Sequence, residues 1–388
     1  MKPDLPQRAE DAVAGFTSTR SKGPAALFGG PDGPSHMVRS SGCRVETADG
    51  RSLLDWTMAL GAVSLGYGHP AVSEAAARAV RDGAVGPLPP VLEVRLAERL
   101  VGVYPGAEQA RFFKTGAEAV AAAVRLARVA TGRTRVVHCG YHGWLDGPTA
   151  GEGVPAEVAA LWHAVPFDDV AALETAARDL RPAAIVLEPV IEHAPSAEWL
   201  AAARRAADAS GAALVFDEIK TAFRLARGGA AESWGVTPDL AVLGKALGNG
   251  FPLAAVVGKT EVMSHVRHTW VSSTLATEYV ALAAADAVLD VWQAEPVAEH
   301  IARVGGKLFN GLRALSVGAE GWELHGLPAM WFLRFKDSER ERDFLLACVR
   351  RGVLLKRGAY NFASLAHGDD EARVTLDAVR EALAETAQ

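Results

Sequence analysis

The sequence predicts an α/β protein with a large domain built on a mainly parallel sheet and a smaller α+β domain. Two observations lead to this prediction. Short apolar strands alternate with amphipathic helices from about residue 111 to 257, and after Pro296 the pattern changes to mixed helices and strands. Alternating strands and helices are typical of a parallel sheet covered on both faces. Ligands then gather beyond the carboxyl ends of the strands.

The composition is that of a globular protein, with 388 residues of which 49% are hydrophobic and 22% are charged. The formal net charge of −6 and the lack of a long basic run argue against nucleic acid as a partner. Cys43, Cys139 and Cys348 are isolated thiols, which suits a reducing cytoplasm better than a disulfide framework. The N-terminus lacks an apolar signal core, and no apolar stretch is long enough for a bilayer span, so no membrane association is expected.

The N-terminal part is expected to contain loops and hairpins. Residues 29–34 are rich in glycine and proline and predict a loop. Residues 37–56 predict one or two hairpins, with a turn at Ala48-Asp49-Gly50. Two helices are expected next, over 71–81 and from about 92 to 101.

The middle of the chain predicts the large sheet. We expect strands at 111–114, 135–138, 183–188, 213–217, 240–244 and 253–257, with helices between several of them. One long helical pattern follows residue 115 and reaches about residue 130, and another long helix spans roughly 277–291. Near the C-terminus, strands are expected at 329–335 and 353–355.

A lysine lies where one of these strands ends. Lys245 follows the apolar strand 240–244 and precedes a glycine-rich turn. Burial lowers the pKa of a lysine, and the neutral amine can attack a carbonyl to form a Schiff base. On this segment alone, a lysine that reaches solvent from a strand end is the more ordinary interpretation.

An acidic residue ends another strand 28 residues earlier. Asp217 follows the apolar run 212–216. Such an aspartate can be a loop carboxylate or a helix cap. Paired with a Schiff-base lysine, it matches the carboxylate that keeps a pyridine nitrogen protonated in sites that use pyridoxal phosphate (PLP).

A strand-to-helix turn completes the set. Thr115, Gly116 and Ala117 lie between a short strand and a long helical pattern. Small residues there leave backbone N–H groups free for a phosphate, and the helix dipole adds to the attraction. An ordinary helix cap is the alternative for this turn.

These residues give the chain a resemblance to the class III PLP-dependent aminotransferases, and within them to the glutamate-1-semialdehyde aminomutase branch. The resemblance covers about residues 42–384. The similar stretches are RFFKTGAEAVAAAVRLARVATGRTRVV, GYHGW, AAIVLEPV, LVFDEIKTAFR, PDLAVLGKALGNGFPLAAVVGK and SSTLATEYVALAAA.

The resemblance implies the aspartate aminotransferase-like fold, PLP fold type I, with PLP as cofactor. Residues 61–294 would form the large PLP-binding domain, and residues 1–60 and 295–388 would together form the small domain. It also implies a homodimer, in which Thr274 reaches the phosphate in the neighbouring subunit's active site. A helix cap before Ala276 is the alternative for Thr274.

The resemblance assigns further residues to cofactor binding. Tyr141 would stack on the pyridine ring, although a buried structural tyrosine is the alternative. His142 is expected as a hydrogen-bonding neighbour, and Glu188 as a supporting residue. Ile219 would lie beneath the ring.

Two other positions near the expected cofactor depart from the family pattern. His193 occupies a position that often holds Asn or Glu, and it would reach the phenolic oxygen of the cofactor or the substrate; a surface loop histidine is the alternative. Lys220 stands where relatives have Gln or Met. It would either recognise an anionic substrate group or point to solvent. Arg224 and Arg357 are candidate carboxylate binders by charge, but a surface ion pair is the more ordinary role for each.

The function expected from these observations is PLP-dependent transfer of an amino group between an amine or amino acid and a carbonyl substrate, through Lys245. An intramolecular aminomutase is an alternative. Racemisation, decarboxylation and carbon-bond formation begin from the same adduct of substrate and cofactor, and they remain alternative reactions. A catalytically inactive PLP-fold partner subunit is the alternative from another class. No sequence pattern for a metal site or a Gly-x-Ser-x-Gly nucleophile is present.

Overall fold

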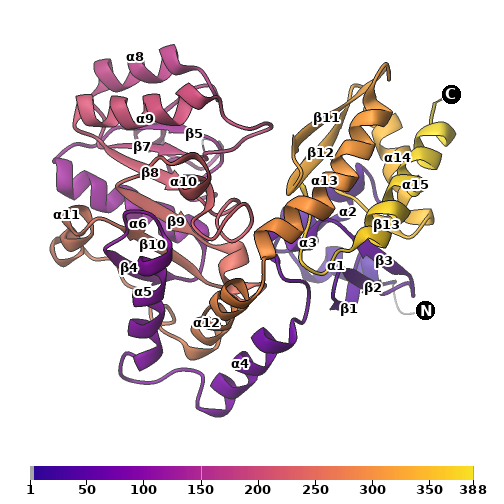
Figure 1. The fold of residues 1–388 in the computed structure, drawn as a ribbon, viewed down its shortest axis with the longest axis horizontal. Coiled ribbons are helices and arrows are strands. Elements are labelled where there is room, and N and C mark those ends of the chain that lie inside the picture. Colours follow the sequence, from indigo (N-terminus) through magenta and orange to yellow (C-terminus); the bar gives the residue numbers. More distant parts are fainter. Residues whose placement is uncertain (1–3, 150, 388) are drawn as a thin grey trace. The chain divides into compact units, whose positions relative to one another are not determined.

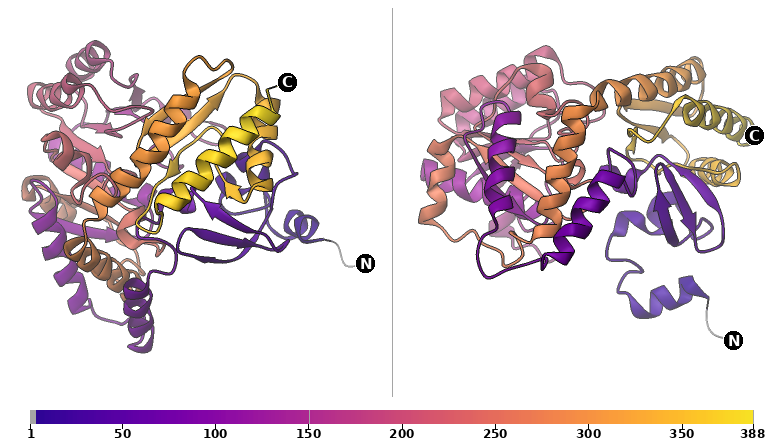
Figure 2. Two further views of the ribbon diagram at one scale, coloured as in Figure 1. Left: turned by 45° about the vertical axis from the view of Figure 1, so that its right-hand side comes forward. Right: turned by 60° about the horizontal axis from the view of Figure 1, so that its bottom comes forward.

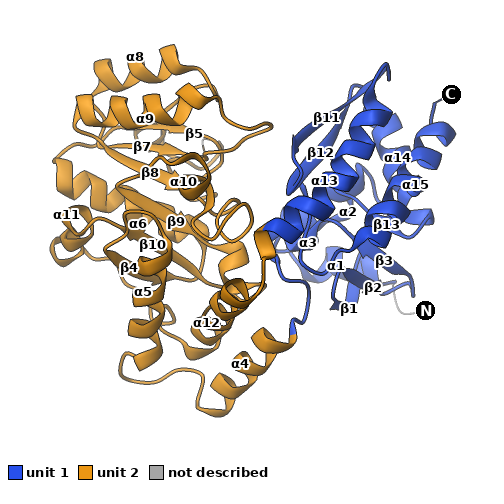
Figure 3. Cartoon of the chain, in the orientation of Figure 1, with its two compact units in different colours: residues 1–69, 299–388 blue, residues 70–298 orange. Residues whose placement is uncertain are grey.

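The computed structural model describes residues 4–149 and 151–387 and divides into two compact units (Figures 1 and 3). Unit 1 contains residues 1–69 and 299–388, and unit 2 contains residues 70–298. The sequence-based bounds at residues 61–294 stay a prediction of which part of the chain binds the cofactor.

Unit 2 is built around one seven-stranded sheet with the strand order β4-β10-β9-β8-β7-β5-β6. Its strands are β4 (Gln109–Phe113), β5 (Val136–Cys139), β6 (Trp162–Ala164), β7 (Ala184–Leu187), β8 (Ala213–Asp217), β9 (Leu240–Leu243) and β10 (Ala254–Gly258).

The sheet is mainly parallel, as expected. Parallel pairs join β6, β5, β7, β8 and β9, whereas β10 runs antiparallel to both of its neighbours, β9 and β4. Because β10 opposes both, β4 runs in the same direction as β9. The carboxyl ends of β4, β5, β7, β8 and β9 therefore lie at one edge of the sheet.

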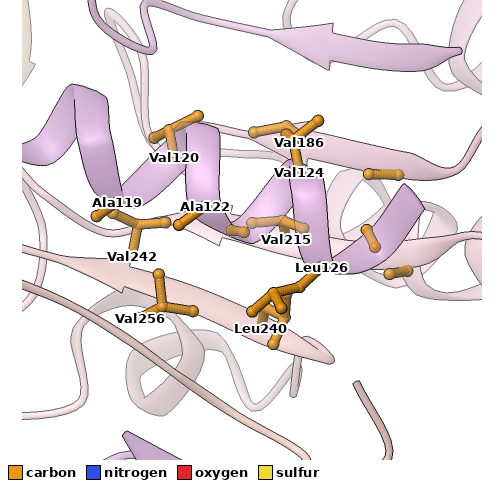
Figure 4. Close-up of a cluster of buried hydrophobic side chains, with 14 of the residues drawn as sticks. Ala119, Val120, Ala122, Val124, Leu126, Val186, Val215, Leu240, Val242 and Val256 are labelled. Atoms are coloured by element: carbon orange, nitrogen blue, oxygen red, sulfur yellow. The ribbon is translucent and has the colours of Figure 1, made fainter. Parts of the chain in front are cut away.

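Helix α6 (Gly116–Thr131) covers one face of this sheet (Figure 4). Its small apolar residues recur at helical spacing and pack on the valines that alternate along the strands. Gly132 ends the helix in the left-handed conformation, with φ of +66°. The buried residues of this cluster include Ala119, Val120, Val124, Val186, Val215, Val242 and Val256.

The other helices of unit 2 are α4 (Pro70–Arg81), α5 (Val91–Val103), α7 (Ala156–Ala159), α8 (Val170–Leu180), α9 (Ala197–Ser210), α10 (Gly229–Trp234), α11 (Thr260–Met263) and α12 (Tyr279–Ala294), with 3₁₀ turns η2 (Lys245–Gly248) and η3 (Ser264–His268). Helix α12 packs against α4 and α5, and α8 packs against α9. Helix α12 begins two residues later than expected, because the Glu278 side chain caps it by accepting from the N–H groups of Val280 and Ala281.

Unit 1 contains two small sheets, β1-β2-β3-β13 and β11-β12-β14. The strands are β1 (Met37–Ser41), β2 (Arg44–Thr47), β3 (Ser52–Asp55), β11 (Trp322–Leu327), β12 (Met330–Phe335), β13 (Val353–Leu354) and β14 (Asn361–Phe362). The hairpins expected over residues 37–56 are β1-β2 and β2-β3.

The helices of unit 1 are α1 (Leu5–Ala12), α2 (Pro24–Phe28), α3 (Met58–Gly61), α13 (Val297–Ser316), α14 (Ser338–Arg350) and α15 (Asp369–Glu385), with the 3₁₀ turn η1 (Arg20–Lys22); α13 begins in the last residues of unit 2. Helices α13 and α15 lie side by side (Figure 2), and Arg303 and Lys307 of α13 pair with Asp369 of α15. None of the helices in the described part of the chain combines the length and apolar character that a membrane span requires.

Candidate active site

The polar residues predicted from the sequence lie at the shared carboxyl edge of the sheet in unit 2. Thr115 follows β4, Tyr141 follows β5, Glu188 follows β7, Asp217 ends β8 and Lys245 follows β9. The last two strands are in register, with Asp217 opposite Val242. The apolar strands thus end in a row of polar side chains, as expected at the ligand-binding edge of a parallel sheet.

Ile219 lies where three of these strand ends meet. A Cβ added to Gly116 would stand 2.3 Å from Ile219 Cδ1, so the turn before α6 packs directly on this side chain. A Cβ on Gly244 would stand 3.5 Å from Ile219 Cγ1. Ile219 therefore contacts the residues that precede Lys245 and those that follow Thr115, and it provides an apolar surface between them.

Asp217 is held by two hydrogen bonds. Its Oδ2 lies 2.8 Å from Nδ1 of His142, and its Oδ1 accepts from the N–H of Ile219 at 3.2 Å. Both side chains are buried, with exposed fractions of 3% for Asp217 and 2% for His142. Each carboxylate oxygen has two lone pairs, so the group can accept a further hydrogen bond. His142 therefore fixes the orientation of Asp217 without using up its acceptors.

The amine of Lys245 lies in surroundings that disfavour its charge. The pKa of Lys245 is lowered to about 8, mainly by burial and next by the positive charge of Lys220, while Glu188 and Asp217 act in the opposite direction. The backbone of Lys245 is in the left-handed region, with φ of +47°. This is an uncommon conformation for a residue other than glycine, and such conformations cluster at functional sites.

The hydrogen bonds within the turn that precedes α6 are those of an ordinary capping box. Thr115 Oγ1 accepts from the N–H of Glu118 at 3.2 Å, and Glu118 Oε2 accepts from the N–H of Thr115 at 2.9 Å. The N–H groups of Gly116 and Ala117 belong to the first turn, where a helix supplies no acceptor. The cap and an anion site are therefore compatible at this turn.

Glu188 links Tyr141 to Lys220. Its Oε1 accepts from the backbone N–H of Tyr141 at 2.6 Å, and its Oε2 forms an ion pair with Lys220. Gly140 has φ of +108°, and a Cβ there would stand 2.6 Å from Glu188 Cγ. The chain that leads to Tyr141 thus packs against Glu188, whereas the Tyr141 side chain itself is 65% exposed. The alternative of a buried structural tyrosine is therefore wrong.

The loop that carries Tyr141 also reaches the turn before α6. A Cβ added to Gly143 would stand 2.5 Å from Cβ of Ala117. Together with the contacts of Ile219, this places Thr115, Gly116, Ala117, Tyr141, His142, Glu188, Asp217, Ile219 and Lys245 in one neighbourhood of unit 2.

Two predicted residues have no contact with this neighbourhood among the described residues. His193 is exposed, packs on Phe167 with ring centroids 5.0 Å apart, and donates from Nδ1 to its neighbour Ala194. Thr274 is also exposed. It does not cap a helix before Ala276, because α12 begins at Tyr279. Their expected roles stay predictions.

The sequence did not show which ion pairs Lys220, Arg224 and Arg357 form. Lys220 neither points to solvent nor stands free for a substrate anion; its ammonium pairs with Glu188 and its side chain is only 14% exposed. Arg224 is fully buried rather than a surface residue, and burial lowers its pKa to about 9. Arg357, by contrast, forms the expected ion pair, with Glu341 at 2.9 Å. The sequence placed Glu188 and Lys220 at or just after predicted strands, but no sequence signal showed that these two strands are adjacent or that the two residues pair.

The residues of this neighbourhood fit the expected cofactor. A half-buried amine, a buried carboxylate with spare lone pairs and a helix N-terminus with open N–H groups match its aldehyde, ring nitrogen and phosphate. Gly116 and Gly244 pack on Ile219, and Gly143 packs on Ala117, so side chains at these three positions do not fill the space beside the turn. No cluster of three or more metal-ligating side chains is found within the described ranges.

Comparison with known proteins gives one consistent family. The model of the class-III aminotransferases matches residues 31–383. Two curated proteins named glutamate-1-semialdehyde 2,1-aminomutase are each 34% identical to this chain. The one from Ignicoccus hospitalis aligns with 90% of this chain and 92% of its own length, and the one from Gemmatimonas aurantiaca with 94% and 93%.

The similarity extends to solved structures. The PLP internal aldimine form of the FumI protein from Sphingopyxis sp. MTA144 superposes on this chain with a TM-score of 0.93. The two sequences are 28% identical, and the match covers 99% of this chain and 96% of that one.

Proposed function

Because the chain belongs to the class-III aminotransferase family, we propose that the strand ends of unit 2 are the site at which it moves an amino group between an amine or amino acid and a carbonyl compound. The expected fold type I and PLP as cofactor are confirmed by the family and by the PLP-containing structure. When bound, PLP supplies an aldehyde for a Schiff base and a ring that accepts electrons.

Lys245 acts as the nucleophile and as the proton carrier in this proposal. Its Nζ would hold the cofactor through the aldehyde. Once displaced by the substrate amine, the Lys245 amine would carry the proton that moves during the reaction. A pKa of about 8 places the neutral and charged forms of Lys245 close in free energy near neutral pH, which suits a group that must accept and donate.

Asp217 holds the ring nitrogen in this proposal. Its carboxylate would accept the N–H of the ring and balance its charge, and His142 Nδ1, which donates to Oδ2, keeps the carboxylate in place. Nε2 of His142 is buried and has no hydrogen-bond partner among the described residues, so the side-chain hydrogen bond of His142 is the one to Asp217.

The remaining residues orient the cofactor. Thr115, Gly116 and Ala117 would bind the phosphate at the start of α6, and Ile219 would support one face of the ring. Tyr141 would cover the other face, since its side chain is exposed while Glu188 fixes its backbone. His193 remains a predicted neighbour of the cofactor or substrate.

The observation that supports this proposal most directly is the placement of Lys245 and Asp217 at the ends of the adjacent strands β9 and β8. Purified protein should absorb near roughly 410–430 nm, and borohydride should fix the cofactor to Lys245, as peptide mass mapping would show. Lys245→Ala should lose both signals. A wild-type protein that takes up no added PLP, or a cofactor fixed at another lysine, would contradict the assignment.

An intramolecular aminomutase is the second candidate, because two relatives at 34% identity have that name. A mutase converts a single substrate, whereas a transaminase stops after one turnover unless a carbonyl acceptor is added. Glutamate 1-semialdehyde carries both an amine and an aldehyde, so its products separate the two reactions. An isomer that keeps the nitrogen supports the mutase, whereas a product in which the amine has been replaced by a carbonyl supports transfer.

We also propose that the protein acts as a homodimer. Exposed apolar side chains flank Thr274: Trp270 is 83% exposed and Leu275 is 52% exposed. A second copy of the chain would cover them and bring Thr274 to the neighbouring phosphate. Trp270→Asp should yield monomers in light scattering and weaken PLP binding, whereas Thr274→Ala should weaken PLP binding without changing the mass. A native wild-type monomer would contradict this proposal.

The cytoplasm is the compartment we propose. Cys43, Cys139 and Cys348 are all buried and unbonded, and burial raises the pKa of each thiol. Inert single thiols are common in reducing compartments. Fractionation of the native host with an antibody would test this placement, and recovery outside the cytoplasmic fraction would overturn it.

A further inference from the structure

A second lysine follows the strand adjacent to that of the proposed nucleophile, and its charge acts on Lys245. Lys220 follows β8, three residues after Asp217, and Lys245 follows the adjacent strand β9. The side chain of Lys220 is 14% exposed. Two ammonium groups that are close together and poorly hydrated repel each other. The neutral form of one of them is therefore favoured.

Glu188 decides which of the two lysines stays charged. Its Oε2 forms an ion pair with Lys220, and no such pair is formed by Lys245 within the described residues. The Glu188 side chain is 8% exposed, so the pair is shielded from solvent. A close carboxylate favours the ammonium form of its partner. The proton is therefore kept on Lys220 and released more easily from Lys245.

The same pair also fixes part of the wall of the site. Oε1 of Glu188 accepts from the N–H of Tyr141 at 2.6 Å, while Oε2 is occupied by Lys220. Lys220 thereby holds Glu188 in the orientation that positions the Tyr141 loop. Removing one partner of a buried pair leaves the other charge uncompensated, so Glu188 depends on Lys220.

We propose that Lys220, anchored by Glu188, is a positioning residue that increases the fraction of Lys245 in its neutral, nucleophilic form. The proposal rests on the assignment of Lys245 as the nucleophile, but the effect belongs to the protein chain and does not need the cofactor.

The charged groups that act on Lys245 divide by the sign of their charge. Lys220 and Arg224 favour loss of its proton, while Glu188 and Asp217 favour its retention. Among these groups the charge of Lys220 has the largest effect after burial itself. Arg224 is fully buried and has a smaller effect. Lys220 is thus the side chain whose removal should change the titration of Lys245 most.

The test is the titration of Lys245 in cofactor-free protein. The rate at which acetic anhydride labels Lys245 is measured from pH 6 to 11 by mass spectrometry of its peptide, in wild type, Lys220→Gln and Lys220→Met. Both neutral variants should move the midpoint upward by about half a unit to one unit, which lowers the neutral fraction at pH 7 by roughly 3- to 10-fold.

Two further variants separate charge from structure. Lys220→Arg keeps the positive charge and should keep the wild-type midpoint. Lys259→Gln removes a lysine that pairs with Asp239 at 2.7 Å outside the site, and it should leave the midpoint unchanged. Circular dichroism confirms that each variant is folded, and having two neutral variants guards against a folding failure in one.

The proposal is overturned if folded Lys220→Gln or Lys220→Met titrates like wild type, or if Lys259→Gln shifts Lys245 equally. Failure of the proposed function would look different. It would leave this titration intact while PLP fails to attach to Lys245.

Discussion

The burial of Lys245 should cost stability, and this cost can be measured. The pKa of Lys245 is lowered from 10.5 to about 8. Between these two values the unfolded chain binds more protons than the folded one, so stability rises with pH across this window. At pH 7 the full shift corresponds to about 3 kcal/mol of destabilisation, and at pH 10 less than about 1 kcal/mol remains. Because Lys245 is partly exposed, screening by solvent reduces the expected value at pH 7 to about 1–2 kcal/mol.

Lys245→Met removes the charge and keeps most of the length of the side chain. Cofactor-free Lys245→Met should therefore melt higher than wild type at pH 7, by about 2–8 °C for a unit of this size. The difference should shrink to about a quarter at pH 10, where the wild-type amine is neutral in the folded state. Differential scanning calorimetry at both pH values measures it. Lys259→Met, which breaks a half-exposed ion pair with Asp239, is the control and should not raise the melting temperature.

The reasoning is refuted by either of two results. One is a Lys245→Met protein that melts no higher than wild type at pH 7. The other is a gain that persists undiminished at pH 10, since a packing effect does not depend on the protonation of Lys245.

Three further predictions follow from the geometry of unit 2. Asp217→Asn keeps the shape of the side chain but removes its charge, and amino-group transfer in stopped-flow half-reactions should slow by about 100-fold or more; a rate near that of wild type would exclude Asp217 as the ring partner. Gly116→Ala places a Cβ 2.3 Å from Ile219 Cδ1, so PLP binding in a fluorescence titration should weaken by about tenfold or more, and unchanged affinity would place the cofactor elsewhere. Glu218→Gln sets an amide against two backbone N–H donors of α10, so the free energy of unfolding measured in urea should fall by about 2–4 kcal/mol. The control Glu261→Gln, at an exposed position, should change it by no more than about 0.5 kcal/mol, and equal effects of the two substitutions would contradict this prediction.

The sequence predicted the sheet well because its signals are local. Apolar runs such as 213–217 and 240–244 are too short for helices and are separated by helical patterns, so their identity as strands follows from period and length alone. The antiparallel direction of β10 could not be read in this way, since a buried strand has the same composition in either direction. Strand β6 was missed because its three residues, Trp162–Ala164, are too few to show a pattern.

The positions of the chemical groups were also predictable, because they follow strand ends. Their partners were not. His142 and Asp217 are 75 residues apart in the chain, and nothing in either segment specifies the 2.8 Å contact between them. The same holds for Glu188 and Lys220. Such pairs depend on the register and spacing of strands that are distant in sequence, and these are set by packing of the whole sheet.

The protonation of Lys245 depends on which charged side chains pair with each other at the strand ends, and not only on where these side chains lie. A lone lysine at the end of an apolar strand would reach for solvent and keep its proton. Here Lys220 takes the available carboxylate of Glu188, and Asp217 is oriented by His142, so Lys245 has no hydrogen-bonded acid of its own among the described residues. Its amine is left with burial and a neighbouring positive charge, both of which favour the neutral form. The Lys220–Glu188 ion pair, in which Lys245 takes no part, therefore favours the neutral form of Lys245. The titration of Lys245 in the Lys220 variants measures how much of the lowered pKa comes from this pair and how much from burial.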